Sequence, residues 1–183
     1  MKYFEHESAA TFDEAVSLLK ESPKGKTVVM AGGSDLIGVL KEQILEDYPE
    51  KVVDLKTVRG GEYIKQDGDT IEIGALTKLC DIVKSDLLNE KAPVLSQAAR
   101  SLATPLIRNV ATMGGNICQD VRCWFYRYPH GIGGRMDCMR KGGKECYAVM
   151  GDNRYHSIFG GMKVHTTPCS VQCPANTDIP AYM

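Results

Sequence analysis

Two pairs of adjacent glycines stand where the sequence pattern changes from one predicted element to the next. The first pair lies in Ala31-Gly32-Gly33-Ser34-Asp35-Leu36, between a predicted strand and a predicted helix. Main-chain amides at such a junction, together with the helix dipole, favour an anion, and phosphate is the anion expected. The second pair lies in Thr112-Met113-Gly114-Gly115-Asn116, where the backbone can approach a ligand closely while a hydroxyl and an amide supply hydrogen bonds.

Each glycine segment taken alone also fits a plain tight turn. Neither segment contains GxGxxG or the P-loop pattern, which argues against a Rossmann dinucleotide site and against an NTPase. The chain also has no nucleophile elbow and no HExxH motif, so hydrolysis has no support in the sequence. A single phosphate-binding site built from both segments requires them to converge in space.

Strand-like and helix-like patterns alternate over roughly the first 110 residues and would position these loops. Thr11-Phe12-Asp13-Glu14 is a capping box ahead of apolar residues at helical spacing, which predicts a helix over 12–22. Ser34 and Asp35 are predicted to cap a short helix ending near residue 41, and Thr77 to cap another ending near residue 84. The other predicted elements are strands at 27–30 and 51–55, a hairpin of 63–66 with 70–73, and helices at 91–101 and from 105 to 110. Beyond Met113 the pattern predicts little regular structure.

The two glycine segments and the pattern between them resemble a known family. AGGSDLIG at 31–38 and IRNVATMGGNICQD at 107–120 are similar to the signature segments of the FAD-binding domain of xanthine dehydrogenases, carbon monoxide dehydrogenases and 4-hydroxybenzoyl-CoA reductases. The resemblance covers roughly residues 1–160 and implies that both segments wrap the FAD pyrophosphate and ribityl chain. The implied FAD contacts are Ala31, Gly32, Gly33, Ser34, Asp35, Leu36, Thr112, Gly115 and Asn116.

The same resemblance implies the fold class and the division of the chain. The expected fold is α+β: the two-lobed FAD-binding fold of the molybdenum-hydroxylase flavoprotein type, with an irregular cysteine-rich C-terminal segment. The expected parts are a first FAD-binding lobe at 1–58, a second lobe at 59–120, a cysteine-rich insertion at 121–160, and a linker with the start of a second iron–sulfur-type domain at 161–183.

Six of the seven cysteines lie between Cys118 and Cys173, and in a reducing compartment such clustering favours metal ligands or redox chemistry. The segment at 121–156 resembles the insertion in the flavin subunit of 4-hydroxybenzoyl-CoA reductase, which holds a [4Fe-4S] cluster through four cysteines. Three ligands carry over as Cys123, Cys138 and Cys146. The fourth position aligns near Arg154, and His156 or Cys118 could replace the missing cysteine. Zinc bound by three cysteines and a histidine, and plain buried thiols, are the alternatives.

Cys169-Ser-Val-Gln-Cys173-Pro174 and the following Asp-Ile-Pro resemble the start of the iron–sulfur domain of glutamate synthase small chains and dihydropyrimidine dehydrogenases. Two thiols cannot complete a four-cysteine cluster. The resemblance therefore implies either an N-terminal fragment of a longer fused reductase or a partner that supplies ligands. A surface tail with inert thiols is the alternative.

Composition limits the partners and the location. Lysine and arginine total 22 against 23 acidic residues, which argues against nucleic acid, although residues 1–120 carry a net charge of −5 and 121–183 a net charge of +4. No apolar run approaches the length of a membrane span, and the first ten residues lack the apolar core of a secretory signal. A cytoplasmic protein without a membrane span is therefore expected.

The predicted function is an FAD-dependent oxidoreductase component that relays electrons between an iron–sulfur centre and a molybdopterin or NAD(P)H partner. The implied partners are molybdopterin-binding and ferredoxin-like subunits, or a downstream NAD(P)H-oxidoreductase domain. No side chain is an evident general acid or base, so no catalytic residue is predicted. The alternative from another class is a non-enzymatic assembly or binding module that holds no flavin and has a structural zinc or inert cysteines.

Overall fold

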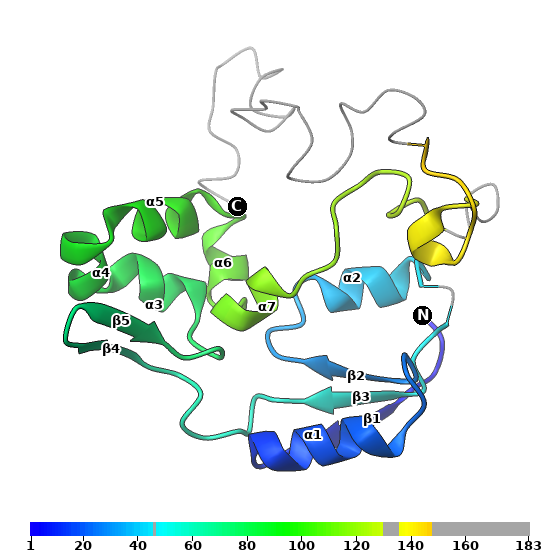
Figure 1. Cartoon of the computed structure of the whole chain (residues 1–183), viewed down its shortest axis with the longest axis horizontal. Coiled ribbons are helices and arrows are strands. Elements are labelled where there is room, and N and C mark those ends of the chain that lie inside the picture. Colours follow the sequence, from blue (N-terminus) through cyan, green and yellow to red (C-terminus); the bar gives the residue numbers. More distant parts are fainter. Residues whose placement is uncertain (46, 130–135, 148–183) are drawn as a thin grey trace.

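The fold is α+β, with a parallel three-stranded sheet and a separate antiparallel hairpin, each packed against helices (Figure 1). A computed structural model describes residues 1–45, 47–129 and 136–147. Among these residues, no helix has the length and apolar character needed to cross a bilayer.

The parallel sheet is built from the first 54 residues and has the order β1-β3-β2. Its strands are β1 (Glu5–Ser8), β2 (Thr27–Met30) and β3 (Lys51–Asp54). Helix α1 (Phe12–Glu21) joins β1 to β2, and α2 (Leu36–Lys41) joins β2 to β3. Because neighbouring residues of a strand face opposite sides of the sheet, Val53 packs against α1 and Val52 against α2, and both are fully buried. The two helices therefore cover opposite faces of the central strand (Figure 1).

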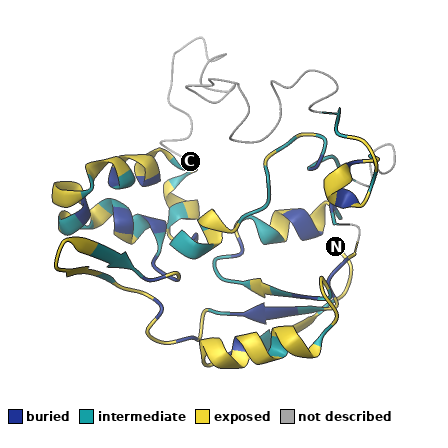
Figure 2. Ribbon diagram, viewed as in Figure 1, coloured by how far each residue is buried: buried dark blue, intermediate teal, exposed yellow. Residues whose placement is uncertain are grey.

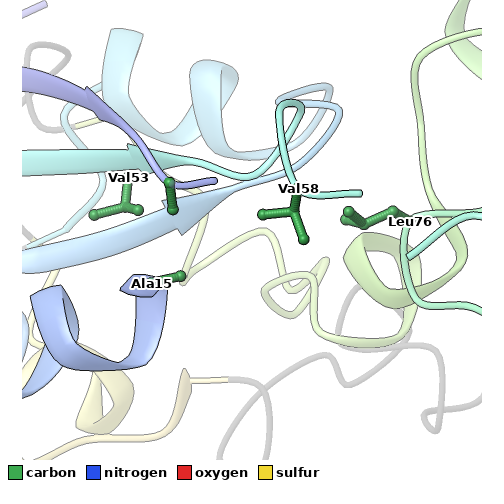
Figure 3. Packing of buried hydrophobic residues seen from close by; sticks show 5 residues of the cluster. Ala15, Val53, Val58 and Leu76 are labelled. Atoms are coloured by element: carbon green, nitrogen blue, oxygen red, sulfur yellow. The ribbon is translucent and has the colours of Figure 1, made fainter. Parts of the chain in front are cut away.

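Helix α1 forms where the capping box predicts it. The Glu14 amide donates to the Thr11 hydroxyl at 3.1 Å, and the Glu14 carboxylate accepts from the Ala10 amide at 2.7 Å, one residue earlier than in the usual box. Ala15 on its inner face points toward Val53, while the outer face of the helix is exposed (Figures 2 and 3). The same apolar cluster continues through Val58 to Leu76 and so links the sheet to the second group of elements.

The second group contains the hairpin and five short helices. The elements are β4 (Ile64–Asp67), β5 (Thr70–Ile73), α3 (Leu79–Lys84), α4 (Asp86–Lys91), α5 (Pro93–Ser101), α6 (Pro105–Arg108) and α7 (Met113–Ile117), and a 3-10 helix follows at Met139–Lys141. Their shared core surrounds Ile82 and Leu88, which are fully buried. The predicted lobe boundary at residue 58 lies between the two groups and stays a prediction.

Two helical predictions differ from the structure. The helix expected over 91–101 is α5 alone, which starts at Pro93 because proline is favoured in the first turn, and α4 precedes it under a cap by Ser85. The second glycine segment, expected to be a loop, contains α7, whose N-cap is Thr112. Because glycine has a low helix propensity, the two glycines give no signal for this turn of helix.

Thr77 was expected to cap α3, but the N-cap position of that helix is Lys78 and no side chain caps it. The Thr77 hydroxyl instead bonds to the main chain of Tyr63: it accepts from the Tyr63 amide at 3.0 Å and donates to the Tyr63 carbonyl at 2.9 Å. Thr77 is only 3% exposed, so this pair of hydrogen bonds fixes the start of the hairpin against the start of α3.

Thr77→Val should lower the free energy of unfolding by about 1–3 kcal/mol, because the isosteric side chain leaves the Tyr63 amide unpaired and leaves the Tyr63 carbonyl with the Gly74 amide as its one donor. Urea denaturation followed by circular dichroism measures the change. Thr70→Val, at an exposed position of β5, is the matched control and should shift the free energy by less than about 0.5 kcal/mol. Equal midpoints for the two variants would contradict the role given to Thr77.

Candidate cofactor site

The two glycine segments meet in space, as a shared phosphate site requires. A Cβ atom placed on Gly32 would overlap the carbonyl oxygen of Val110 and lie 3.0 Å from the Cα of Ala111. The loop after β2 therefore packs backbone to backbone against the residues that lead into α7. Figure 1 shows the start of α2 and the α6–α7 region side by side at this point.

The first segment offers main-chain donors. Within the described residues, the amides of residues 32–36 donate no hydrogen bond, and the next amide, of Ile37, donates to the Gly33 carbonyl at 3.0 Å. Gly33 has a φ of +72°, a left-handed conformation that turns the chain and favours glycine. The loop follows the carboxyl end of β2 in a parallel sheet, the edge where such sheets bind ligands. Five consecutive free amides at that edge can bind a diphosphate.

The second segment offers side chains, because the main-chain amides of residues 113–116 are already used. The amides of Met113 and Gly114 donate to the carbonyls of Thr77 and Ala75, both at 2.8 Å, and those of residues 115 and 116 donate to Thr112. The side chain of Asn116 makes no hydrogen bond within the described residues, and Thr112 is buried with its hydroxyl turned into the segment.

Among the residues that the structure describes, the space next to Gly115 is open except toward one side-chain hydroxyl. A Cβ atom there would meet one neighbour within 4 Å, the Thr112 hydroxyl at 2.9 Å. At Gly114, by contrast, a Cβ atom would lie 2.9 Å from the Ala75 carbonyl oxygen, so that glycine is needed for packing within the protein. Gly115 is thus the position in the second segment where a ligand can approach the backbone.

Asp35 does not cap α2 as the sequence predicts, because its side chain has other partners. One carboxylate oxygen, Oδ2, accepts from Arg127 at 3.0 Å and from the Asp120 amide at 3.3 Å. The other, Oδ1, lies 2.9 Å from Arg122, an ion pair without hydrogen-bond geometry. Residues 120–127, which follow α7, are therefore linked to the first glycine segment through the Asp35 carboxylate. Neither arginine was predicted, and the net positive charge of 121–183 was the one signal that pointed to them.

Residues 120–127 also form hydrogen bonds among themselves. Arg127 donates to the carbonyls of Val121 at 2.8 Å and Asp120 at 2.9 Å, and the Tyr126 hydroxyl donates to the Asp120 carboxylate at 2.9 Å. Burial, followed by this hydrogen bond, raises the pKa of Tyr126, so the phenol stays protonated as a donor throughout the ordinary pH range.

Two of the predicted metal ligands lie in an apolar environment. Cys138 is buried in a cluster with Val39, Ile44 and Tyr126, and Cys123 packs against the same cluster. Cys123, Cys138 and Cys146 are free thiols, and within the described residues no three or more histidine, cysteine or acidic side chains are placed to hold a metal ion. His156, Cys169 and Cys173 lie outside the described residues. The predicted ligand set stays a prediction.

A hollow of about 370 Å³ lies elsewhere, at the amino ends of the parallel strands. Its lining includes Glu5, Thr27 and Lys51, the first residues of the three strands. The glycine segments lie at the carboxyl edge, so this hollow is at the wrong end of the sheet for the phosphate site.

Comparison with known families and proteins agrees with this geometry. The family model described as the FAD binding domain in molybdopterin dehydrogenase matches residues 2–127. The nicotinate dehydrogenase FAD-subunit of Eubacterium barkeri is 33% identical over 117 residues, which are 64% of this chain and 39% of that protein. The aldehyde oxidoreductase FAD-binding subunit of Escherichia coli K12 is 29% identical over 161 residues, 87% of this chain and 48% of that protein. A match of that length extends past residue 127 into the cysteine-rich segment.

Solved structures show the same fold. Carbon monoxide dehydrogenase from Hydrogenophaga pseudoflava superposes with a TM-score of 0.60 at 31% identity, over 63% of this chain and 39% of that chain. Quinoline 2-oxidoreductase from Pseudomonas putida 86 superposes with a TM-score of 0.58 at 26% identity, over 63% of this chain and 40% of that chain. The two-lobed α+β fold expected from the sequence is confirmed. The chain spans about two fifths of the length of these relatives.

Proposed function

The chain belongs to the family of FAD-binding domains in molybdopterin dehydrogenases, and from this premise we propose that it is the FAD-binding part of a multi-component oxidoreductase of the molybdenum-hydroxylase type. The observation that carries the proposal is the contact between the two glycine segments, with the free amides of residues 32–36 beside it. One segment supplies donors for a diphosphate, and the other leaves room for a ligand at its side.

The residues present fit FAD. The amides of residues 32–36 bind the pyrophosphate, and Asn116 supplies a side-chain hydrogen bond from the second segment, where the buried Thr112 hydroxyl accepts from Gly115 and keeps its own hydrogen to donate. Gly115 lets the ligand approach the backbone. Bound FAD supplies the redox chemistry through its isoalloxazine ring, while the protein binds and orients it. The proposed contacts remain Ala31, Gly32, Gly33, Ser34, Asp35, Leu36, Thr112, Gly115 and Asn116. At Gly32 and Asp35 they concern the backbone.

FAD titration of the full 183-residue chain tests the proposal. We expect one FAD per chain, with competition by ADP, which carries the diphosphate, and much weaker competition by AMP and FMN, which carry a single phosphate. Quenching of flavin fluorescence measures the binding. A chain that neither retains FAD on purification nor binds added FAD would contradict the proposed function.

The proposed partners are subunits or domains that exchange electrons with this one. Relatives are named as FAD-subunits or medium chains of dehydrogenases, which supports a multi-component assembly. We propose that electrons pass between an iron–sulfur centre and a molybdopterin or NAD(P)H partner. A [4Fe-4S] cluster held by Cys123, Cys138, Cys146 and His156 is one candidate for that centre, and the match to the aldehyde oxidoreductase subunit runs through the segment that contains these residues.

Iron content decides whether the cluster belongs to the proposal. In anaerobically purified protein, a cluster requires about four iron atoms per chain, and Cys146→Ser should lower that number because one thiolate ligand is lost. Cys80→Ser, at a half-buried thiol of α3, is the matched control. A parent chain without iron removes the cluster and leaves the FAD proposal intact.

A further inference from the structure

The proposed diphosphate site has a negative charge built into it. Asp35 belongs to the loop whose amides are free, and its carboxylate is only 16% exposed. A half-buried carboxylate beside a site for a doubly charged anion weakens binding, because water screens the repulsion poorly there. The loop can bind a diphosphate well only if this charge is compensated.

Two arginines from a distant part of the chain provide the compensation. Arg127 lies 3.0 Å from Oδ2 of Asp35 and is itself only 17% exposed, and Arg122 lies 2.9 Å from Oδ1 with its side chain 55% exposed. The remaining nearby carboxylate, of Asp120, is occupied by the Tyr126 hydroxyl.

Arg127 is also held in place before any ligand arrives. Its guanidinium donates to two main-chain carbonyls, those of Val121 and Asp120, in addition to Asp35. A guanidinium fixed by several hydrogen bonds loses little further freedom on pairing with a carboxylate. The neutralised state of Asp35 is therefore preorganised in the folded chain.

We propose that Arg127, assisted by Arg122, is a positioning residue that neutralises Asp35 and thereby permits diphosphate binding at residues 32–36. This inference rests on the proposed FAD function and assigns a task to the 120–127 segment. Removing Arg127 leaves the mostly buried Asp35 with only the more exposed Arg122 as its counter-charge, and removing Asp35 as well takes the negative charge away from the site. The effects of the two changes on FAD affinity should therefore be strongly non-additive.

A double-mutant cycle on the full chain tests the assignment. Arg127→Gln should weaken FAD binding by about thirtyfold, since the more exposed Arg122 alone compensates the mostly buried carboxylate only in part. Adding Asp35→Asn to that variant should restore affinity to within about threefold of the parent. If the pair acts only as a mechanical anchor, the double variant will bind FAD as weakly as Arg127→Gln or more weakly, and this result would overturn the proposal.

If Arg127→Gln folds poorly, a variant of the more exposed Arg122 still tests the proposal. Arg122→Gln removes the more exposed guanidinium and should weaken FAD binding by about threefold, with the thermal midpoint of the flavin-free chain unchanged. FAD affinity equal to the parent's in Arg122→Gln, together with a double variant that is not rescued, overturns the charge assignment. Failure of the parent chain to bind FAD would instead overturn the proposed function, so the two failures are distinguishable.

Discussion

In Gly115→Val, FAD affinity should fall by about 100-fold while the flavin-free chain loses about 1 kcal/mol of stability, because the new Cβ crowds the Thr112 hydroxyl that caps α7. The side chain would extend into the open space where the ligand approaches, since the one protein atom near its Cβ is the Thr112 hydroxyl. Glycine and valine differ by only a few tenths of a kcal/mol in helix propensity, so α7 should still form. FAD titration and urea denaturation of the same preparations measure the two effects.

Gly38→Ala is the matched control for this variant. Gly38 lies in α2, and a Cβ atom there would meet no atom of the described residues within 4 Å. The change should leave FAD affinity unaltered and stabilise the chain by about 0.5–1 kcal/mol through helix propensity. Gly33 is a poorer choice, because its φ of +72° makes any side chain strained whether or not FAD binds. Unchanged FAD affinity in Gly115→Val would remove the second glycine segment from the site.

The elements around the site were predictable where their signals are local. The capping box at Thr11 and the β-branched run at 27–30 are each read from a few adjacent residues, and α1 and β2 begin where these signals place them. Helix α7 was missed because Met113, Gly114 and Gly115 carry no helical signal of their own. It is stabilised by bonds to Ala75 and Thr77, which lie far away in sequence.

The sequence predicted which two segments form the site. It did not predict which segment supplies free main-chain amides and which leaves space for the ligand. A pair of glycines indicates that the backbone there lies close to another group. The sequence cannot show whether that group belongs to the protein or to a ligand. The structure separates the cases: Gly32 and Gly114 face the protein backbone, and Gly115 faces open space. The run of five consecutive free amides is in the first segment, whereas the amides of residues 113–116 in the second are used, partly by contacts with residues 75 and 77.

Asp35 shows why local rules fail at this loop. An aspartate just before a helix is a favoured cap, and that rule predicts a bond to the helix amides. Arg127, 92 residues later, takes the carboxylate instead, because a charge-assisted bond to a preorganised guanidinium is stronger than a capping bond. A cap by Asp35 would have used the amide of Ile37 or Gly38, and the Ile37 amide donates to the Gly33 carbonyl instead. The long-range ion pair thus directs the carboxylate toward the 120–127 segment and away from the helix amides.

Gly32→Ala should lower the free energy of unfolding by about 3 kcal/mol and also abolish FAD binding. The added methyl group would overlap the Val110 carbonyl oxygen, a main-chain atom that cannot rotate away. The strain can be relieved only by moving the first glycine segment away from the residues that precede α7. Because the proposed site exists only while the segments touch, loss of this contact should remove both stability and cofactor.

The loss of stability together with FAD binding distinguishes Gly32→Ala from Gly115→Val. In Gly115→Val the ligand is excluded from an intact protein, whereas in Gly32→Ala the protein on which the ligand depends is itself displaced. Urea midpoints measured with and without FAD separate the cases. Gly115→Val without FAD should unfold at a midpoint only slightly below the parent's and should lose the shift that FAD causes, and Gly32→Ala should have a much lower midpoint in both conditions. A parent-like midpoint for Gly32→Ala without FAD would mean that the two segments do not pack against each other, and the shared diphosphate site would then have no structural basis.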